Sequence, residues 1–188
     1  LINGLEKLEY RGYDSAGVAI INSETKTITC NKAEGKLINL INNLNDKTIP
    51  GTVGIGHTRW ATHGKPEVKN AHPHTDSSGT IAVVQNGIIE NFQELKNKLE
   101  EEGITFNSDT DTEVIPHLIQ RELNTLSKLN LENSGSTLLV AVRNVISDLE
   151  GSYALAVLWA GAPTSLVVAR KQAPLIIGLG EGEFICAS

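Results

Sequence analysis

With 188 residues, 40% of them hydrophobic, the chain is long enough to bury one core, and we expect a single domain. A formal net charge of -6 leaves no basic stripe to neutralise phosphates, which argues against a nucleic-acid partner. No apolar run reaches the roughly 20 residues needed to cross a bilayer, so no membrane association is expected. Cys30 and Cys186 stand alone, which predicts neither a disulfide framework nor a zinc site and fits a reducing cytoplasm.

The chain opens on a helical pattern. Apolar residues at helical spacing predict a helix over residues 1–9, which ends before Gly12. Two β-rich runs, at 16–21 and 26–30, predict strands joined as a hairpin, and a further helix is expected over 37–44. The first part of the chain is therefore expected to form a hairpin with helices beside it.

The middle of the chain combines buried strands with amphipathic helices. The runs at 52–56 and 80–84 are apolar almost without alternation, which predicts strands that are buried on both faces. A helix is expected over 92–99, stopped by Gly103, and another should follow Asp111.

The last third predicts one helix followed only by strands. Ser136 is expected to cap a helix that ends near Leu149. The strands are expected at residues 153–159, 166–169, 175–177 and 184–186. Buried strands with helices between them imply stacked sheets covered by helices.

Polar residues gather where the strand over 52–56 ends, in the segment HTRWATHG at 57–64. Arg59 offers a planar fork that suits a carboxylate, while Thr62 and His63 add neutral donors. A small amino-acid ligand is one interpretation of this segment. Simple stacking of Arg59 and Trp60 on a loop is the other.

A second polar segment follows the strand over 80–84. Asn86 and Gly87 could aim a carboxamide and a backbone N–H at one point, which is the makeup of an oxyanion hole. On these residues alone, an ordinary type I′ hairpin turn is the favoured interpretation.

A third polar segment spans residues 109–113. Thr110 and Glu113 could form a capping box for the next helix, or an acidic side chain there could hold an ammonium group. The glycine and the distal glutamate of an EF-hand loop are absent, so calcium is not expected.

Four of the five histidines, at positions 57, 63, 72 and 74, fall in one stretch and raise a metal-dependent hydrolase as a rival hypothesis. Their spacing lacks a His-Glu-x-x-His pattern, and a hydrogen-bonding scaffold is the favoured interpretation. No phosphate-binding loop is present, and neither cysteine has a base nearby in the sequence. Read alone, the residues predict a ligand site without a nucleophile.

Four motifs occur in a recognisable order: LEYRGYDSAG at 8–17, HTRWATHG at 57–64, NGIIEN at 86–91 and TDTE at 110–113. Together they resemble the class II glutaminase domain over nearly the whole chain. Amidophosphoribosyltransferases and asparagine synthetases share versions of the last two motifs. The first two are most similar to those of the glutamine:fructose-6-phosphate aminotransferase family.

The resemblance implies an α+β fold, a four-layer αββα sandwich of the N-terminal-nucleophile hydrolase type. It also implies hydrolysis of glutamine by an N-terminal cysteine whose α-amino group serves as base, without a metal or other cofactor. Residues 1–188 would form one incomplete glutaminase domain. Sugar isomerase domains that use the ammonia to make glucosamine 6-phosphate would follow it, in a chain that forms a homo-oligomer.

The resemblance assigns one set of residues to substrate binding. Arg59 would bind the α-carboxylate of glutamine, with Thr62 and His63 beside it and His72 on the same wall. Asp111 would bind the α-ammonium.

A second set is assigned to catalysis by the same resemblance. The side chain of Asn86 and the N–H of Gly87 would stabilise the oxyanion, while Arg11 and Gly12 would lie beside the nucleophile. Trp60 would border the ammonia exit.

The chain departs from the family pattern at both ends. The family begins with Cys-Gly-Ile on a first strand, whereas Leu1 already lies in a helical pattern. We therefore expect a fragment that lacks the first strand and the nucleophile, stops short of a complete domain at Ser188, and is inactive by itself. Pro116 predicts a late start or a mild kink in the helix after Asp111.

Overall fold

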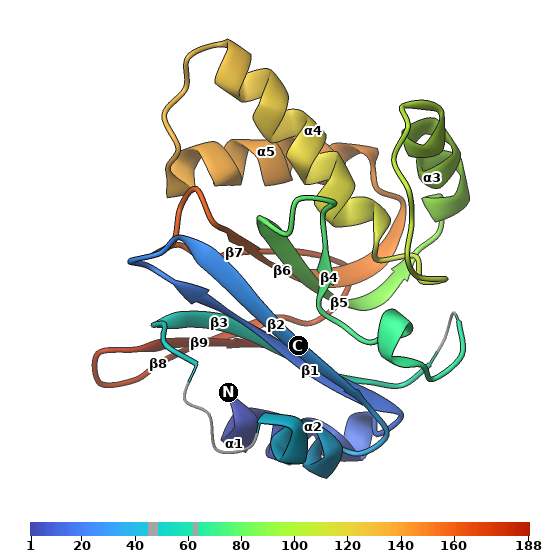
Figure 1. The fold of residues 1–188 in the computed structure, drawn as a ribbon, viewed down its shortest axis with the longest axis vertical. Helices are drawn as coiled ribbons and strands as arrows, with labels where there is room; N and C mark the ends of the chain where they lie inside the picture. Colours follow the sequence, from blue (N-terminus) through green and yellow to red (C-terminus); the bar gives the residue numbers. More distant parts are fainter. Residues whose placement is uncertain (45–48, 62–63) are drawn as a thin grey trace.

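A computed structural model of the protein describes residues 1–44, 49–61 and 64–188. Its elements stack in four layers, in which two β-sheets face each other and helices cover their outer faces (Figure 1). The expected four-layer αββα arrangement is confirmed. None of the helices among these residues is long and apolar enough to cross a membrane.

The first sheet is three-stranded and antiparallel, in the order β2-β1-β3. Its strands are β1 (Ser15–Asn22), β2 (Thr27–Glu34) and β3 (Val53–Arg59). The β1-β2 pair is the predicted hairpin. Two helices, α1 (Ile2–Leu8) and α2 (Leu37–Leu44), cover the outer face, where Leu5, Leu37 and Leu40 pack on β1. A short 3-10 turn, η1 (Glu9–Arg11), follows α1 and leads to Gly12.

The second sheet is four-stranded and antiparallel, in the order β4-β5-β6-β7. Its strands are β4 (His74–Thr75), β5 (Ile81–Ile89), β6 (Gly151–Trp159) and β7 (Val167–Lys171). The start of β5 is buried on both faces, as predicted. Ala82 and Val84 point toward the first sheet, whereas Ile81 and Val83 point toward the helices.

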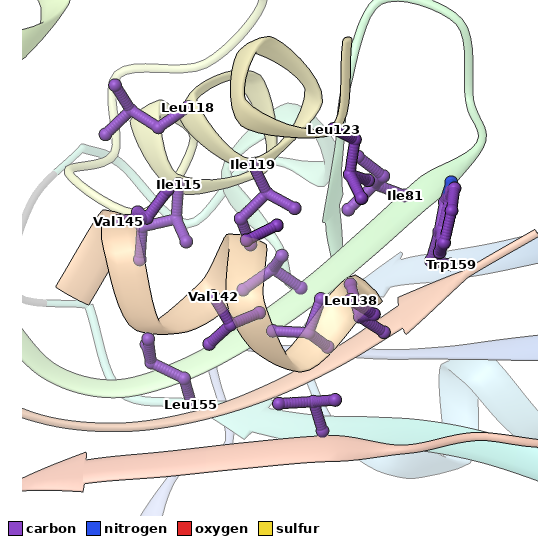
Figure 2. Packing of buried hydrophobic residues seen from close by; sticks show 14 of the residues in the cluster. Ile81, Ile115, Leu118, Ile119, Leu123, Leu138, Val142, Val145, Leu155 and Trp159 are labelled. Atoms are coloured by element: carbon purple, nitrogen blue, oxygen red, sulfur yellow. The ribbon is translucent and has the colours of Figure 1, made fainter. Parts of the chain in front are cut away.

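Three helices accompany the second sheet: α3 (Phe92–Glu101), α4 (Val114–Lys128) and α5 (Gly135–Asp148). Figure 2 shows how α4 and α5 close the main core, with Ile115 and Ile119 of α4 above Leu138 and Val142 of α5. This cluster anchors β5 rigidly because side chains in a packed interior have few alternative positions.

The chain ends in a separate two-stranded hairpin, β8 (Ile176–Leu179) and β9 (Phe184–Ala187). Its apolar side chains are largely exposed, including Leu179 and Phe184. After β9, Ser188 reaches Arg11 and Asn86, so the end of the hairpin lies beside residues of the predicted site.

Three of the local sequence predictions are wrong. Asn86 and Gly87 do not form a hairpin turn, because β5 continues through them and pairs with Ala154 and Tyr153 of β6. The N-cap of α5 is Ser134, whose Oγ accepts from the N–H of Thr137, rather than Ser136.

The predicted capping box at α4 is also wrong. The helix begins at Val114 after an N-cap, Glu113, that makes no side-chain capping bond. The carboxylate of Glu113 instead accepts hydrogen bonds from the backbone N–H groups of Asn107 and Ser108, at 2.8 and 2.6 Å. It therefore fixes the preceding loop rather than the helix. Pro116 lies in the first turn, consistent with the expected late start.

Candidate active site

The candidate site forms where the end of β3, the middle of β5, η1 and the loop before α4 meet. Gly12 is buried against β3: a Cβ atom on it would lie 2.6 Å from the carbonyl carbon of Arg59 and 2.8 Å from the backbone nitrogen of Trp60. Such distances leave no room for a side chain. The close approach brings η1 against the strand end that carries Arg59.

Arg59 is a buried cation, only 4% exposed. Its guanidinium lies 3.7 Å from the carboxylate of Asp14 and donates to the carbonyl oxygens of Gly64 and Lys65, each at 3.4 Å. Burial lowers the pKa of Arg59, whereas the charges of Asp14 and Asp111 raise it. The guanidinium is thus held in place between carboxylates and loop carbonyls.

Asp14 contributes to this arrangement, although its motif gave no hint of the role. Besides facing Arg59, its carboxylate accepts a hydrogen bond from the N–H of Ala61, and its own N–H donates to the carbonyl of Arg59. Asp14 therefore fixes both the side chain of Arg59 and the backbone that follows it.

Asp111 is a buried anion on the other side of the site, also 4% exposed. Its Oδ2 accepts a hydrogen bond of 2.7 Å from the N–H of Ile89. This bond ties the loop before α4 to β5, two residues beyond Gly87. The structure consequently brings Asp111 close to both Arg59 and the strand that carries Asn86.

Asn86 and Gly87 lie where β5 emerges from the core, and both are accessible to solvent. Gly87 has φ of +126°, and a Cβ there would lie 2.1 Å from the carbonyl oxygen of Ser152. Glycine is required for this close contact between strands. Asn86 and Gly87, which could polarise a carbonyl group, therefore lie on a rigid strand.

Ser188 links Asn86 to Arg11. Its Oγ accepts from Nδ2 of Asn86 at 3.3 Å, and its carbonyl oxygen accepts from Nη1 of Arg11 at 2.8 Å. No pattern in the sequence marks this residue, since a serine after a short apolar run is not characteristic of a functional site. Only its contacts in the folded structure show that Ser188 lies beside the site.

His72, expected on the wall of the substrate site, is buried and only 5% exposed. Its Nδ1 accepts from the N–H of Gln85, and its Nε2 lies 3.4 Å from the hydroxyl of Thr112, which itself donates to the Gln85 side chain. These partners place the ring proton on Nε2 and require a neutral imidazole. His72 connects β5 with the loop that carries Asp111.

The neighbouring histidines form a stack with His72. The rings of His57 and His72 lie 4.3 Å apart, and His74 meets His72 edge-on at 4.9 Å. Burial, followed by the charges of Arg59 and Arg11, lowers the pKa of His57 to about 4. Burial, followed by the charge of Lys32, lowers the pKa of His74 to about 3. In the part of the chain that the structure describes, no three His, Cys, Asp or Glu side chains form a metal-binding group.

Trp60 is 60% exposed and meets the ring of Tyr13 edge-on, with centroids 5.4 Å apart. It lies at the surface, next in the chain to the buried Arg59. Thr62 and His63, both expected at the substrate, lie outside the described residues.

Glu113 fixes the loop that leads to Asp111. Besides two backbone groups, its carboxylate accepts from the hydroxyl of Ser108 at 2.5 Å. Burial raises the pKa of Glu113, but the hydrogen-bond donors around the carboxylate together lower it to about 2. Glu113 is therefore an ionised support for the loop at neutral pH.

Fold and site together define an amidotransferase of the N-terminal-nucleophile type. A family model described as a glutamine amidotransferase domain matches residues 57–188. The chain belongs to this family.

Curated relatives give a narrower similarity. The chain is 55% identical over 188 residues to a glutamine–fructose-6-phosphate aminotransferase (isomerizing) of Thermosynechococcus vestitus, covering 100% of this chain and 29% of the relative. Proteins of the same name in Clostridium tetani (52% identical, 29% of the relative) and Pyrococcus horikoshii (54%, 30%) are also matched over 100% of this chain. The chain thus spans less than a third of the length of these relatives.

Solved structures agree with the fold. The glutamine phosphoribosylpyrophosphate amidotransferase of B. subtilis, complexed with ADP and GMP, superposes with a TM-score of 0.79 at 28% identity, covering 98% of this chain and 38% of that one. A structure described as the allosteric regulatory enzyme of purine biosynthesis gives a TM-score of 0.80 at 29% identity, with the same coverage.

Proposed function

We propose that this domain hydrolyses L-glutamine to glutamate and ammonia, within a longer enzyme that transfers the ammonia to fructose 6-phosphate. The observation that carries the proposal is the pairing of a buried cation, Arg59, with a buried anion, Asp111, beside an accessible carboxamide on β5. The names of the curated relatives support the sugar phosphate as acceptor.

Substrate recognition rests on the two charged groups. The guanidinium of Arg59, held by Asp14 and by the carbonyl oxygens of Gly64 and Lys65, binds the α-carboxylate of glutamine. Asp111 binds the α-ammonium through Oδ1, the carboxylate oxygen that does not bond Ile89 and lies 3.4 Å from the hydroxyl of Thr112. Thr62 and His63 add hydrogen bonds on the carboxylate side. This leaves the side-chain amide of the substrate directed toward Asn86.

Catalysis then depends on charge that develops on the amide oxygen. The Nδ2 group of Asn86 and the N–H of Gly87 donate to this oxygen as it becomes an oxyanion. Donors of this kind act most strongly in the transition state when they are already oriented, and β5 provides that orientation. Arg11 and Gly12 line the position of the attacking group.

The nucleophile is a cysteine outside residues 1–188, in keeping with the family. Neither cysteine of the chain suits this role, because burial raises the pKa of Cys30 and keeps it protonated, and Cys186 lies within β9, where its nitrogen belongs to a peptide bond and cannot serve as the α-amino base. The thiolate attacks the amide carbon, ammonia leaves past Trp60, and water hydrolyses the resulting thioester to glutamate. Residues 1–188 alone bind glutamine without turning it over.

The sugar chemistry belongs to isomerase domains that follow this one, in a homo-oligomeric enzyme. The fraction of each relative that the chain covers, 29% in Thermosynechococcus vestitus, supports such additional domains.

The test compares the full-length enzyme with residues 1–188. The full-length enzyme should release glutamate from L-glutamine and form glucosamine 6-phosphate when fructose 6-phosphate is present. Residues 1–188 should bind L-glutamate in calorimetry and release no ammonia. Failure of the full-length enzyme to consume L-glutamine, or glutamate release by residues 1–188, would contradict the proposal.

A further inference from the structure

Asn70 is a fully buried polar residue in an otherwise exposed segment. It ends the short 3-10 turn η2 (Val68–Asn70), in which Val68 and Lys69 face solvent while Asn70 is 0% exposed. Burying a carboxamide is unfavourable unless its donors and acceptor are all paired. The hydrogen-bond partners of Asn70 therefore indicate which parts of the chain this segment joins.

The side chain of Asn70 joins two loops. Its Nδ2 donates to the carbonyl oxygen of Lys65 at 3.0 Å and to Oδ2 of Asp109 at 3.2 Å. Its Oδ1 accepts from the N–H of Asp109 at 2.9 Å. The amide thus uses both its NH2 group and its oxygen, and it makes two hydrogen bonds with Asp109.

One of these loops follows Arg59, the last residue of β3, and the other carries Asp111. The Lys65 carbonyl that Asn70 holds is also an acceptor for Nη1 of Arg59. Asp109 lies two residues before Asp111, whose carboxylate is bonded to β5. The Asn70 side chain therefore connects Lys65, whose carbonyl holds the guanidinium of Arg59, with the loop that carries Asp111.

The packing around Asn70 leaves little freedom. A Cβ atom on Gly64 would lie 2.6 Å from Nδ2 of Asn70 and 3.2 Å from Cβ of Asp109. Asparagine also has chemistry that aspartate lacks, since a carboxylate would have no donor for Lys65 and would repel Asp109.

We propose that Asn70 is a positioning residue that sets the spacing between Arg59 and Asp111, and through it the selectivity for a ligand that carries both an α-carboxylate and an α-ammonium. The inference rests on the proposed function and adds a residue that touches neither the substrate nor the reacting atoms. Asn86 and Gly87 are carried by β5, which Asn70 does not contact through any of these bonds. Loss of Asn70 therefore weakens recognition and leaves the chemical step intact.

The experiment measures glutamine hydrolysis by the full-length enzyme with Asn70→Asp. We expect KM for L-glutamine to rise about tenfold or more while kcat stays within about twofold. Inhibition by L-glutamate should weaken by a similar factor, whereas inhibition by glutarate, which lacks the ammonium, should change less than about threefold. A purely structural role would lower kcat and affect both inhibitors equally.

A charge swap provides the rescue. In the double variant Asn70→Asp with Asp109→Asn, the amide and the carboxylate exchange places, and two of the three hydrogen bonds can re-form. The bond to the Lys65 carbonyl stays lost, so KM should recover only in part, to a value between those of Asn70→Asp and the wild type. Lys69→Ala is the matched control, because it removes the 2.9 Å ion pair to Asp109 from the solvent side and leaves Asn70 untouched.

Asp109→Ala serves if Asn70→Asp does not fold, since the Asp109 side chain is 56% exposed. It removes one acceptor of Asn70 and should raise KM about threefold over Lys69→Ala. If the wild-type enzyme hydrolyses glutamine and these variants keep its KM, or lose kcat instead, the inference is wrong and the proposed function stands. A wild-type enzyme that does not use glutamine overturns both.

Discussion

The carboxylate of Asp111 accepts a 2.7 Å hydrogen bond from the backbone N–H of Ile89. The bond crosses from the loop before α4 to β5, the strand that also carries Asn86 and Gly87. Under the proposed function, the group that binds the substrate ammonium and the groups that stabilise the oxyanion therefore share one support. Their effects can still be separated by substitution, because one acts on binding and the other on the transition state.

Substitutions at the charged anchors should mainly affect KM. Arg59→Lys keeps the charge but loses the bidentate fork, and Asp111→Asn loses the charge while keeping an acceptor for Ile89. Both should raise KM for glutamine by about tenfold or more in steady-state assays of the full-length enzyme. Glucosamine 6-phosphate synthesis from free ammonia is the control and should be unchanged. Equal loss of both activities would mean that the residues are structural supports.

Asn86→Ala should affect turnover. The carboxamide donor matters most once the carbonyl oxygen becomes an oxyanion, so kcat for glutamine hydrolysis should fall about a hundredfold or more, with KM nearly unchanged. Single-turnover measurement of ammonia release would check this. A rise in KM without loss of kcat would place Asn86 in ground-state binding instead.

Ser188→Ala should have a smaller effect of the same kind. It removes the oxygen that accepts from Asn86 at 3.3 Å and keeps the carbonyl that accepts from Arg11. We expect kcat to fall about threefold, and Ser188→Thr, which retains the hydroxyl, to restore it. If Thr is as impaired as Ala, the hydroxyl contact has no role in orienting Asn86.

Gly87→Ala should destabilise the fold strongly. The residue has φ of +126°, and an added Cβ would lie 2.1 Å from the carbonyl oxygen of Ser152. We expect the free energy of unfolding in urea to fall by about 3 kcal/mol or more. Gly79→Ala is the matched control: φ is +69° there, nothing lies within 4 Å of the added atom, and the cost should be about 1 kcal/mol.

The buried histidines should make stability depend on pH above the range in which carboxylates titrate. The pKa of His57 is about 4 in the folded chain and about 6.5 when unfolded, so the unfolded state binds more protons between these values. The stabilisation is complete above pH 6.5 and is lost as the pH falls toward 4, by about 1.4 kcal/mol per pH unit for each such histidine. His74, with a pKa of about 3, acts in the same direction.

Urea unfolding at pH 7.5 and pH 5 would measure this dependence. His57→Phe keeps a ring against His72 and should reduce the slope by about one proton. An unchanged slope would show that folding does not change the protonation of His57.

The sequence was sufficient for most of the strands, because they follow from local patterns, but not for the short β4. The roles of the site residues came from the resemblance to a known family and stay predictions. Nearly unalternating apolar residues over 80–84 predicted a buried strand, and β5 is buried there between the first sheet and the helices that cover the second sheet. Local pattern failed where distant segments decide the outcome. Asn86-Gly87 has the composition of a turn, but nine residues of pairing with β6 extend the strand through it.

The supporting residues were missed for the same reason. Glu113 bonds backwards to Ser108, not to a helix end, and Asn70 and Ser188 meet partners far away in the chain. No periodicity or motif marks a residue whose role is to join two loops. Such residues become visible only when the loops are placed together.

Strand β5 runs without interruption from the core into the site, whereas the other side of the site is formed by a loop. Local opening of these two sides should therefore require different free energies. Amides in the buried part of β5, residues 81–85, belong to the most protected part of the molecule and should exchange with solvent only on global unfolding. The backbone of Gly64 and Lys65 lies in an exposed loop, so its amides should exchange through local openings that leave the core intact. Under the proposed function, the part of the site around the amino-acid end of glutamine would therefore open more often than the strand beside its reacting amide.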